Sequence, residues 1–308
     1  MGGAPRADVW LLLGHGVEES PVAARLRAAL AEEFGPRCAV VRTADLLLGV
    51  RTGRLTLHAL DGTPVAAPRV VLARMMSPGL GADREITLLR HLEALGAVLV
   101  NPIDAVMACV NKVWQLQQLA LAGLPVPDTL SYADAPLDAV LDAPGMVPEP
   151  CVVKAVRGHR GRRVFLAPDT AMLRDVQGSL RHETPYLFQE YVAHSHGRDL
   201  RVVVVDGRAV AAQTRTGDGT GLTSNLARGG TATQVLGRHP RAEALAVRAA
   251  EVLGLAVAGV DLLFLPDGDF VLCEVNANVG WTEAMAEVAP AVTAACAARL
   301  AHGTPSTG

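Results

Sequence analysis

The sequence lacks several features that mark common classes of protein. No stretch of about 18 uncharged apolar residues occurs, so no membrane span is expected. No basic segment precedes the short apolar run at 9–13, which argues against a signal peptide. Lysine and arginine (28) do not outnumber aspartate and glutamate (31), so bulk charge gives no attraction for nucleic acid. We therefore expect neither a membrane nor a nucleic-acid partner.

Paired cysteines are also missing. The five cysteines are far apart, odd in number, and form no C-x-x-C pair. Each lies in an apolar stretch, which is typical of buried free thiols in a reducing compartment. The sequence therefore predicts a cytoplasmic protein without disulfides.

Three motifs of familiar enzymes are absent too. There is no Walker P-loop, no G-x-G-x-x-G after the first strand, and no G-x-S-x-G elbow. Hydrolase chemistry with a serine nucleophile therefore has no support. Trp114 and Trp281 are expected to be packing residues rather than platforms on which bases stack.

What is present is a chain of 308 residues, half of them hydrophobic, which is enough for two or three packed subdomains. In its first part, short apolar runs alternate with amphipathic segments, a pattern that indicates a parallel α/β domain. The expected strands are 9–13, 38–42, 70–74 and 98–101, and the expected helices are 22–34, 83–95 and 104–123.

The second half has a different pattern, which predicts antiparallel sheet with helices, an α+β arrangement. Asp206-Gly207 separates two apolar runs at 200–205 and 208–213, a strong hairpin signal. A second hairpin is expected over 259–265 and 270–275, and a last helix over about 282–300. The predicted division is an N-terminal α/β domain at 1–101, two subdomains at 102–188 and 189–302, and a tail at 303–308.

Two carboxylates and an amide gather on the second hairpin. Asp261 lies in one strand, close to where the other strand brings back Glu274. Glu274 and Asn276 are two residues apart, so their side chains point to the same face. Oxygen ligands of this kind suit Mg²⁺, whereas the alternative is an exposed polar edge. Because Glu274 lies within an apolar run, where an unpaired carboxylate is costly, metal binding is favoured.

A second cluster combines a strand lysine with a basic loop. Lys154 is surrounded by valines in a strand that reads as buried, and such a lysine needs an anionic partner. Glycines and arginines follow it at 157–163, where backbone N–H groups can approach phosphate oxygens. The alternative is a solvated basic turn.

Two weaker groups complete the candidates. A short strand, Gln189, Glu190, Tyr191 and Val192, can offer backbone groups to an adenine edge, and Asp199 can then bind a ribose hydroxyl. Arg215 and Asn225 bracket a glycine-rich loop that can close over a transferring phosphoryl group. A polar linker and a mobile surface loop are the respective alternatives.

Taken in order, these pieces resemble the ATP-grasp superfamily, and within it the RimK-like glutamate ligases. The sequence of these motifs is most similar to that of the animal enzymes that make N-acetylaspartylglutamate and β-citrylglutamate. The matching stretches are 111–112 with 123–129, 152–154, 189–192, 197–201, 224–225 with 229–230, 259–261 and 273–278. Those shared with the animal enzymes are 86–93, 157–161, 185–189, 195–197 and 276–280.

The resemblance implies an ATP-grasp fold, in which two α+β subdomains hold ATP between their sheets behind an N-terminal α/β domain. It also implies ATP and Mg²⁺, or Mn²⁺, as cofactors. The roles it gives are phosphate binding for Lys112 and Lys154, adenine binding for Gln189, Glu190, Tyr191 and Val192, ribose binding for Asp199, metal binding for Asp261, Glu274 and Asn276, and stabilisation of an acyl-phosphate for Arg215 and Asn225.

The function this implies is ATP-dependent addition of glutamate to a small acidic carboxylate, N-acetylaspartate first and citrate next. Addition of glutamate to a protein C-terminus or a cofactor is one alternative, and a non-catalytic nucleotide-binding module is another. The partners are then small molecules, and self-association stays open. The sequence differs from that of the relatives at 14–20, at Thr223 and at 281–283. These regions can contact the acceptor of glutamate.

Overall fold

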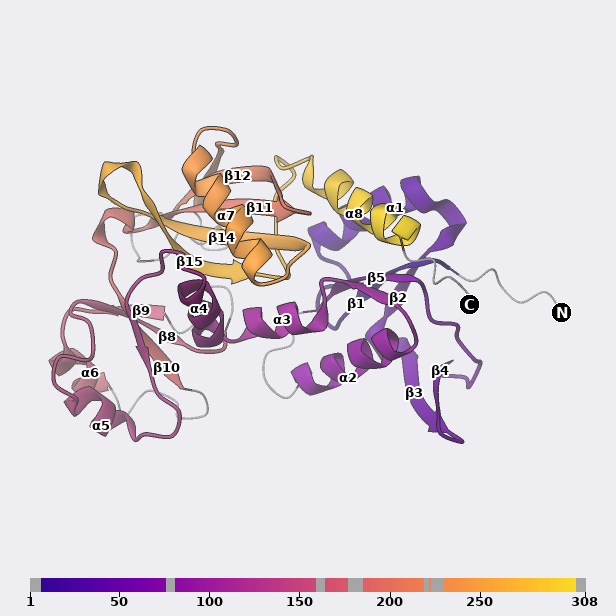
Figure 1. The fold of residues 1–308 in the computed structure, drawn as a ribbon, viewed down its shortest axis with the longest axis horizontal. Coiled ribbons are helices and arrows are strands. Elements are labelled where there is room, and N and C mark those ends of the chain that lie inside the picture. Colours follow the sequence, from indigo (N-terminus) through magenta and orange to yellow (C-terminus); the bar gives the residue numbers. More distant parts are fainter. Residues whose placement is uncertain are drawn as a thin grey trace.

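The described residues form three larger sheets and one two-stranded sheet; the N-terminal sheet lies at one end of the long axis and the other two larger sheets lie at the opposite end (Figure 1). The computed structural model describes residues 7–75, 81–158, 164–176, 185–218, 222 and 230–302. No helix within these residues is long and apolar enough to cross a bilayer. The boundaries predicted at 101, 188 and 302 stay predictions.

The N-terminal sheet is parallel, as predicted, with the strand order β2-β1-β5-β6. Its strands are β1 (Val9–Leu13), β2 (Cys38–Arg42), β5 (Val70–Arg74) and β6 (Val98–Val100). Both faces are covered, which explains why the strands are nearly continuous apolar runs. Helices α1 (Pro21–Phe34) and α8 (Val288–His302) pack on one face and α2 (Gly81–Ala94) on the other. The last helix therefore begins later than predicted and returns to the N-terminal sheet.

A hairpin that was not predicted projects beside this sheet. Its strands are β3 (Leu46–Arg51) and β4 (Arg54–Ala59), paired in antiparallel register. Thr52 and Gly53 form the two-residue turn, both with positive φ (48° and 75°). Such a turn matches the twist of the flanking strands.

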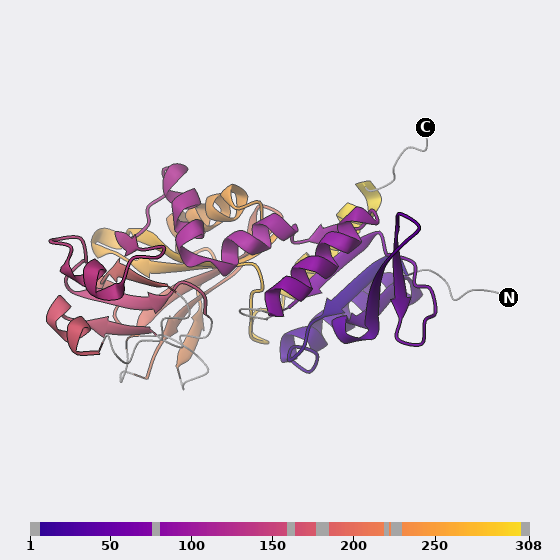
Figure 2. The same ribbon diagram turned by 90° about the horizontal axis from the view of Figure 1, so that it is seen from below.

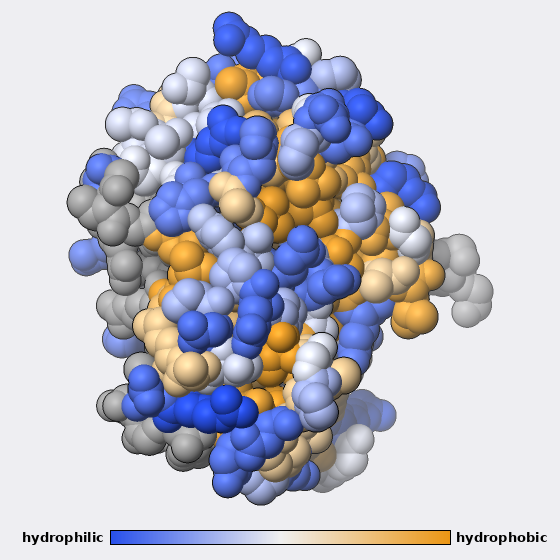
Figure 3. Space-filling model, turned by 90° about the vertical axis from the view of Figure 1, so that its left-hand side faces the viewer, coloured by the Kyte–Doolittle hydropathy of each residue, from blue (hydrophilic) through white to orange (hydrophobic). Residues whose placement is uncertain are grey.

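The second sheet is antiparallel, in the order β7-β10-β8-β9. Its strands are β7 (Thr129–Ser131), β8 (Cys151–Ala155), β9 (Val164–Ala167) and β10 (Tyr186–Glu190). Helices α5 (Leu137–Asp142) and α6 (Thr170–Val176) close a small core over it. The space-filling view of this end of the molecule shows apolar surface enclosed between polar side chains (Figure 3).

The third sheet is also antiparallel, in the order β13-β12-β11-β14-β15, and it confirms both predicted hairpins. Helix α7 (Pro240–Val252) covers one of its faces. The strands are β11 (Arg198–Val205), β12 (Arg208–Thr216), β13 (Thr231–Gln234), β14 (Val257–Phe264) and β15 (Phe270–Asn276).

Two helices stand where one was predicted between the N-terminal sheet and the others. The helix is interrupted at Asn111, between α3 (Ile103–Val110) and α4 (Lys112–Leu121). The Asn111 side chain accepts hydrogen bonds of 3.1 Å from the N–H groups of Val113 and Trp114, so it caps a new helix start. Figure 2 shows α3 and α4 joining the two parts of the molecule.

Candidate active site

One face of the third sheet carries most of the charged residues predicted from the sequence. Asp199 and Arg201 alternate on β11, Arg215 lies opposite Asp199 on β12, and Asp261 lies opposite Arg201 on β14. The intervening residues point the other way and pack under α7. Strand periodicity alone therefore brings these four side chains together.

A β-bulge at Cys273 turns the metal-site residues of β15 toward the same face. The register with β14 shifts by one residue there, while Leu272 and Val275 both stay packed under α7. Without the extra residue, Leu272 and Glu274 would share a face. The bulge explains how Glu274 and Asn276 can follow an apolar run without being buried in the core.

The buried arginines of this face are paired with carboxylates. Arg201 donates two hydrogen bonds of 2.7 Å to the two oxygens of Asp261. Arg215 pairs with both oxygens of Asp199 and lies 3.1 Å from Asp261. Burial alone would raise the pKa of Asp261, but the two guanidinium groups outweigh it and lower that pKa. The four side chains thus form one compensated network.

Lys154 crosses from the second sheet to the third. Its Nζ donates to Oε1 of Gln189 at 2.6 Å and to Sγ of Cys273 at 3.5 Å. Cys273 is the bulged residue, so the lysine meets the third sheet beside Glu274. The predicted phosphate and metal residues are therefore neighbours, although they belong to different sheets.

Lys112, at the first position of α4, is the second predicted phosphate ligand. Its Nζ lies 3.3 Å from Oε1 of Glu274 and donates to the Gly158 carbonyl at 2.9 Å. The break at Asn111 places this lysine beside the third sheet, because a new helix begins there. The structure thus brings Lys112, Lys154 and Glu274 into one region.

The residues predicted to bind adenine end β10 and enter the following turn: Gln189, Glu190, Tyr191 and Val192. The N–H of Glu190 donates to the Asp128 carbonyl at 2.8 Å, and that of Tyr191 to Pro150 at 3.3 Å. Gln189 is buried and bonded to Lys154. Their adenine role, and the ribose role of Asp199, stay predictions.

A cavity of about 200 Å³ extends from the metal-site residues toward the N-terminal sheet. Glu274 and Asn276 line one part of it, and Met75 and Glu85 line the part next to that sheet. Arg157 and Gly158 of the basic loop also line it. A small substrate bound here would contact both the metal site and the N-terminal domain.

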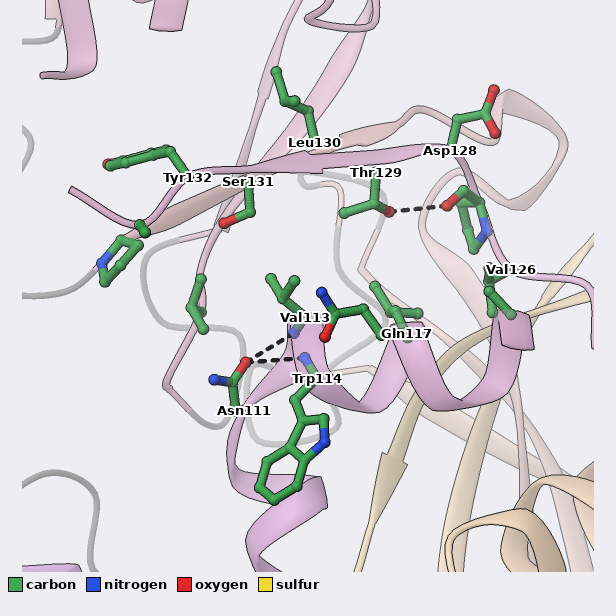
Figure 4. A pocket seen from close by; sticks show the side chains of 16 residues that line it. Asn111, Val113, Trp114, Gln117, Val126, Asp128, Thr129, Leu130, Ser131 and Tyr132 are labelled. Carbon is green, nitrogen blue, oxygen red and sulfur yellow. Dashed lines mark hydrogen bonds between the residues drawn. The ribbon is translucent and has the colours of Figure 1, made fainter. Parts of the chain in front are cut away.

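A larger groove of about 810 Å³ lies between α4 and the edge strand β7 (Figure 4). Its lining includes Trp114, Gln117 and Tyr132, and Trp114, which was predicted to be a packing residue, is 42% exposed. Neither the predicted metal residues nor the predicted phosphate lysines line the groove. The residues predicted to bind metal and phosphate lie at the charged face of the third sheet instead.

Two buried amides that the sequence analysis missed hold the strands of the site. Gln115 donates to the Val275 carbonyl and accepts from its N–H, both at 2.7 Å. Asn101 makes the same pair of bonds, both 2.7 Å, with the backbone of Val257. The only signal in the sequence was an amide within an apolar stretch.

Asn225 and residues 159–163 of the predicted basic loop lie outside the described residues.

Comparison with known proteins agrees with this geometry. The model of the RimK-like ATP-grasp domain matches residues 109–296. An ATP-grasp ligase, PsnB, solved with a minimal precursor, has a TM-score of 0.69 at 22% identity over 95% of this chain and 99% of its own. The D-alanine–D-alanine ligase of Coxiella burnetii gives 0.65 at 16% identity over 96% of each chain. The family model and the fold thus identify an ATP-grasp protein.

Curated relatives narrow the class. Human β-citrylglutamate synthase B is 41% identical over 281 residues, which are 89% of this chain and 72% of the relative. Human N-acetylaspartylglutamate synthase A is 37% identical over 279 residues, 89% and 71% of the two chains. A probable α-L-glutamate ligase of Xanthomonas campestris is 37% identical over 228 residues, 73% and 76%. The chain belongs to the RimK-like ATP-grasp family, as its motifs predicted.

Proposed function

We propose that the protein joins the α-amine of glutamate to a small acidic carboxylate, N-acetylaspartate or citrate, and converts ATP to ADP and phosphate. The observation that carries this proposal is the face of the third sheet where Asp261, Glu274 and Asn276 lie together, with Lys154 reaching it from the second sheet. The names of the curated relatives support glutamate and an acidic partner as substrates. The five free cysteines fit the proposed cytoplasmic location.

The reaction needs two displacements. An oxygen of the acid attacks the terminal phosphorus of ATP, and the bond from that phosphorus to ADP breaks. The amine nitrogen of glutamate then attacks the acyl carbon and loses a proton, and the carbon–oxygen bond to phosphate breaks. Positioning and neutralisation of charge do most of the work, since no covalent nucleophile of the protein is required.

The chain's own cations suit those steps. Lys112 and Lys154 would bind phosphate oxygens, because the Lys112 ammonium lies beside Glu274 and that of Lys154 contacts Cys273, the preceding residue. Arg215, with Asn225, would stabilise negative charge on the acyl-phosphate. Arg215 is held by Asp199 in this structure, so the role requires it to exchange one of its carboxylate contacts for the phosphoryl group.

The metal-site residues fit Mg²⁺ or Mn²⁺. All three offer oxygen, which hard cations prefer, and Asp261 lies directly opposite Glu274 across the ladder. Both oxygens of Asp261 now accept hydrogen bonds from Arg201, so metal binding must displace at least one guanidinium contact. When bound, the ion supplies positive charge for the transferring phosphoryl group.

Addition of glutamate to a protein C-terminus is the second candidate, supported by the relative named as a probable α-L-glutamate ligase. The cavity beside Glu274 and Asn276 measures only about 200 Å³, which favours a small acid over a peptide. A peptide ending in glutamate is therefore included as an acceptor in the test.

The test measures ADP formation with ATP, Mg²⁺, glutamate and each acid in turn, with products identified by mass spectrometry. We expect ADP only when both acid and amine are present, together with the mass of a glutamyl amide. Asp261→Asn and Glu274→Gln should each lower turnover about a hundred- to a thousandfold, because charge on the phosphoryl group loses its stabilisation.

A matched control lies on the same hairpin. The Asp269 side chain is about half exposed and pairs with Arg241 at 2.7 Å, away from the metal-site residues, so Asp269→Asn should leave turnover unchanged. Unchanged turnover in Asp261→Asn would show that the metal assignment is wrong. ATP binding without ADP formation for any acid or peptide would instead support a non-catalytic module.

A further inference from the structure

Four polar side-chain atoms are buried without a hydrogen-bond partner at the junction between the N-terminal sheet and the segment after β15. They are Nε of Arg25, Nε of Arg74, Oδ1 of Asn278 and Nε1 of Trp281. They make up half of the eight such atoms found among the described residues. Because buried polar atoms are normally paired, their concentration here marks a candidate site for a polar ligand.

A cation–π contact and hydrogen bonds to backbone carbonyls link these residues to one another or to the next residue along the chain. Nη2 of Arg25 donates to the Trp281 carbonyl at 2.7 Å, and the guanidinium carbon of Arg74 lies 5.6 Å from the Trp281 ring centroid. Asn278 donates through Nδ2 to the carbonyl of Met75, which follows Arg74. We call the four side chains Arg25, Arg74, Asn278 and Trp281 the junction cluster.

The junction cluster holds two cations and no anion. Among the ion pairs of the described residues, none involves Arg25 or Arg74. Arg74 is only 7% exposed, and burial lowers the pKa of its guanidinium to about 10. A buried cation without an anion is costly, and an anionic ligand would remove that cost.

The position of the junction cluster suits substrate binding. Arg74 is the last residue of β5 and pairs with Leu13, the last residue of β1, at the carboxyl edge of the parallel sheet. Ligands of open α/β sheets bind at that edge. The residues on either side of Arg74, Ala73 and Met75, line the 200 Å³ cavity that reaches the metal site. Arg74 itself points to the α1 side of the sheet, and Asn278 is the member of this group that lines the cavity.

The donors match a carboxylate. Arg25, Arg74 and Trp281 each have an unused N–H, and an arginine presents a planar fork that fits a carboxylate. The unused atom of Asn278 is an acceptor in the cavity wall, which suits an ammonium group instead. Both substrates of the proposed reaction carry a carboxylate that does not react.

We propose that Arg74, assisted by Arg25 and Trp281, binds a non-reacting carboxylate of a substrate and thereby selects dicarboxylates over monocarboxylates. This inference rests on the proposed ligase function and names the residues that recognise its acidic substrate. The carboxylate belongs either to the acid that is activated or to glutamate, and the kinetic test separates the two.

The kinetic test compares Arg74→Met with the wild type at saturating ATP. The KM of one substrate should rise about 10- to 100-fold, because a charged hydrogen-bond pair is lost, while the KM of ATP stays unchanged. The substrate whose KM rises is the one that Arg74 binds. Arg25→Gln should raise the same KM by a smaller factor, and it keeps the test valid if Arg74→Met does not fold.

Arg69 provides a matched control. It precedes β5 at the opposite end of the strand and donates to the Leu300 carbonyl of α8 at 2.7 Å. Arg69→Met should therefore leave every KM unchanged. A fall in kcat for Arg74→Met with all KM values unchanged would contradict the proposal.

A binding experiment separates failure of the subsite from failure of the proposed function. Glutarate and butyrate, which differ by a second carboxylate, are titrated calorimetrically into the wild type with ATP and Mg²⁺ present. We expect glutarate to bind more tightly than butyrate, and Arg74→Met to remove the difference. This holds even if no acid supports ADP formation, whereas equal binding of both probes to the wild type would overturn the subsite.

Discussion

Arginines with little solvent exposure lie at two sites among the described residues, and the two sites differ in how the charge is compensated. On the third sheet, Arg201 and Arg215 are paired with Asp261 and Asp199. At the junction cluster, Arg74 is as buried, yet the described residues give it no carboxylate. On the third sheet, the chain's own carboxylates compensate the charge of the arginines. At the junction cluster, compensation needs an anionic ligand.

The difference indicates how each site meets its ligand. Binding at the third sheet must exchange internal ion pairs for metal and phosphate contacts, so part of the binding energy is used to break them. Binding at the junction cluster replaces no internal pair. A substrate carboxylate there gains charge-assisted hydrogen bonds at little cost.

The largest expected effect on stability comes from removing one partner of the compensated site. Arg201→Met leaves Asp261 buried with Arg215 alone, so the free energy of unfolding should fall by about 3–5 kcal/mol. Urea denaturation measures this free energy. Arg299→Met is the control, because its partner Asp206 is partly exposed and such pairs contribute about 0–1 kcal/mol. Equal losses in the two variants would contradict the comparison.

A smaller effect on stability is expected at Gly259 of β14, where Val279 of the segment after β15 packs against the strand. A Cβ at Gly259 would lie 2.4 Å from Cγ2 of Val279, which is too close. Gly259→Ala should therefore cost about 1–3 kcal/mol of stability, measured by urea denaturation. Val279→Ala removes the clashing methyl groups, so the double variant should be less destabilised than the sum of the single variants. Additive losses would show that the contact is not the cause.

The smallest effect is expected at the junction cluster. Arg74→Met replaces a buried cation that has no carboxylate with an apolar side chain of similar length. The free energy of unfolding without substrate should change by less than about 1 kcal/mol, in the same urea experiment. A loss as large as that of Arg201→Met would mean that the chain already compensates Arg74, and the two sites would then not differ.

Much of the fold could be predicted because local patterns determine it. The parallel strands were located from continuous apolar runs, and Val9–Leu13, Cys38–Arg42 and Val70–Arg74 have the predicted bounds. Two-residue spacing also placed Glu274 and Asn276 on one face correctly. These features depend on neighbours in the sequence, so the sequence alone contains them.

The rest depends on contacts that are distant in the sequence. The bulge at Cys273 follows from the register of β15 against β14, and no local pattern shows it. The helix break at Asn111 is a cap within an apolar stretch, which reads as one continuous helix. The register of the strands is decided by packing, so it could not be predicted, whereas the Asn111 cap is a local hydrogen bond that was hidden within an apolar stretch.

The junction cluster shows the same limit. Trp281 is buried, as predicted, at 6% exposure. That it covers Arg74, about two hundred residues earlier in the chain, follows only from the return of the last segment to the N-terminal sheet. The departure from the relatives at 281–283 was the only hint in the sequence that this region concerns the acceptor.

Oxygen transfer from the acid tests the proposed ligase reaction most directly. The acid substrate is labelled with ¹⁸O in its reacting carboxylate and turned over with ATP, Mg²⁺ and glutamate. An acyl-phosphate route predicts one labelled oxygen in each inorganic phosphate released, because the carboxylate oxygen that attacked phosphorus leaves with it. Unlabelled phosphate, or AMP and pyrophosphate in place of ADP and phosphate, would contradict the account.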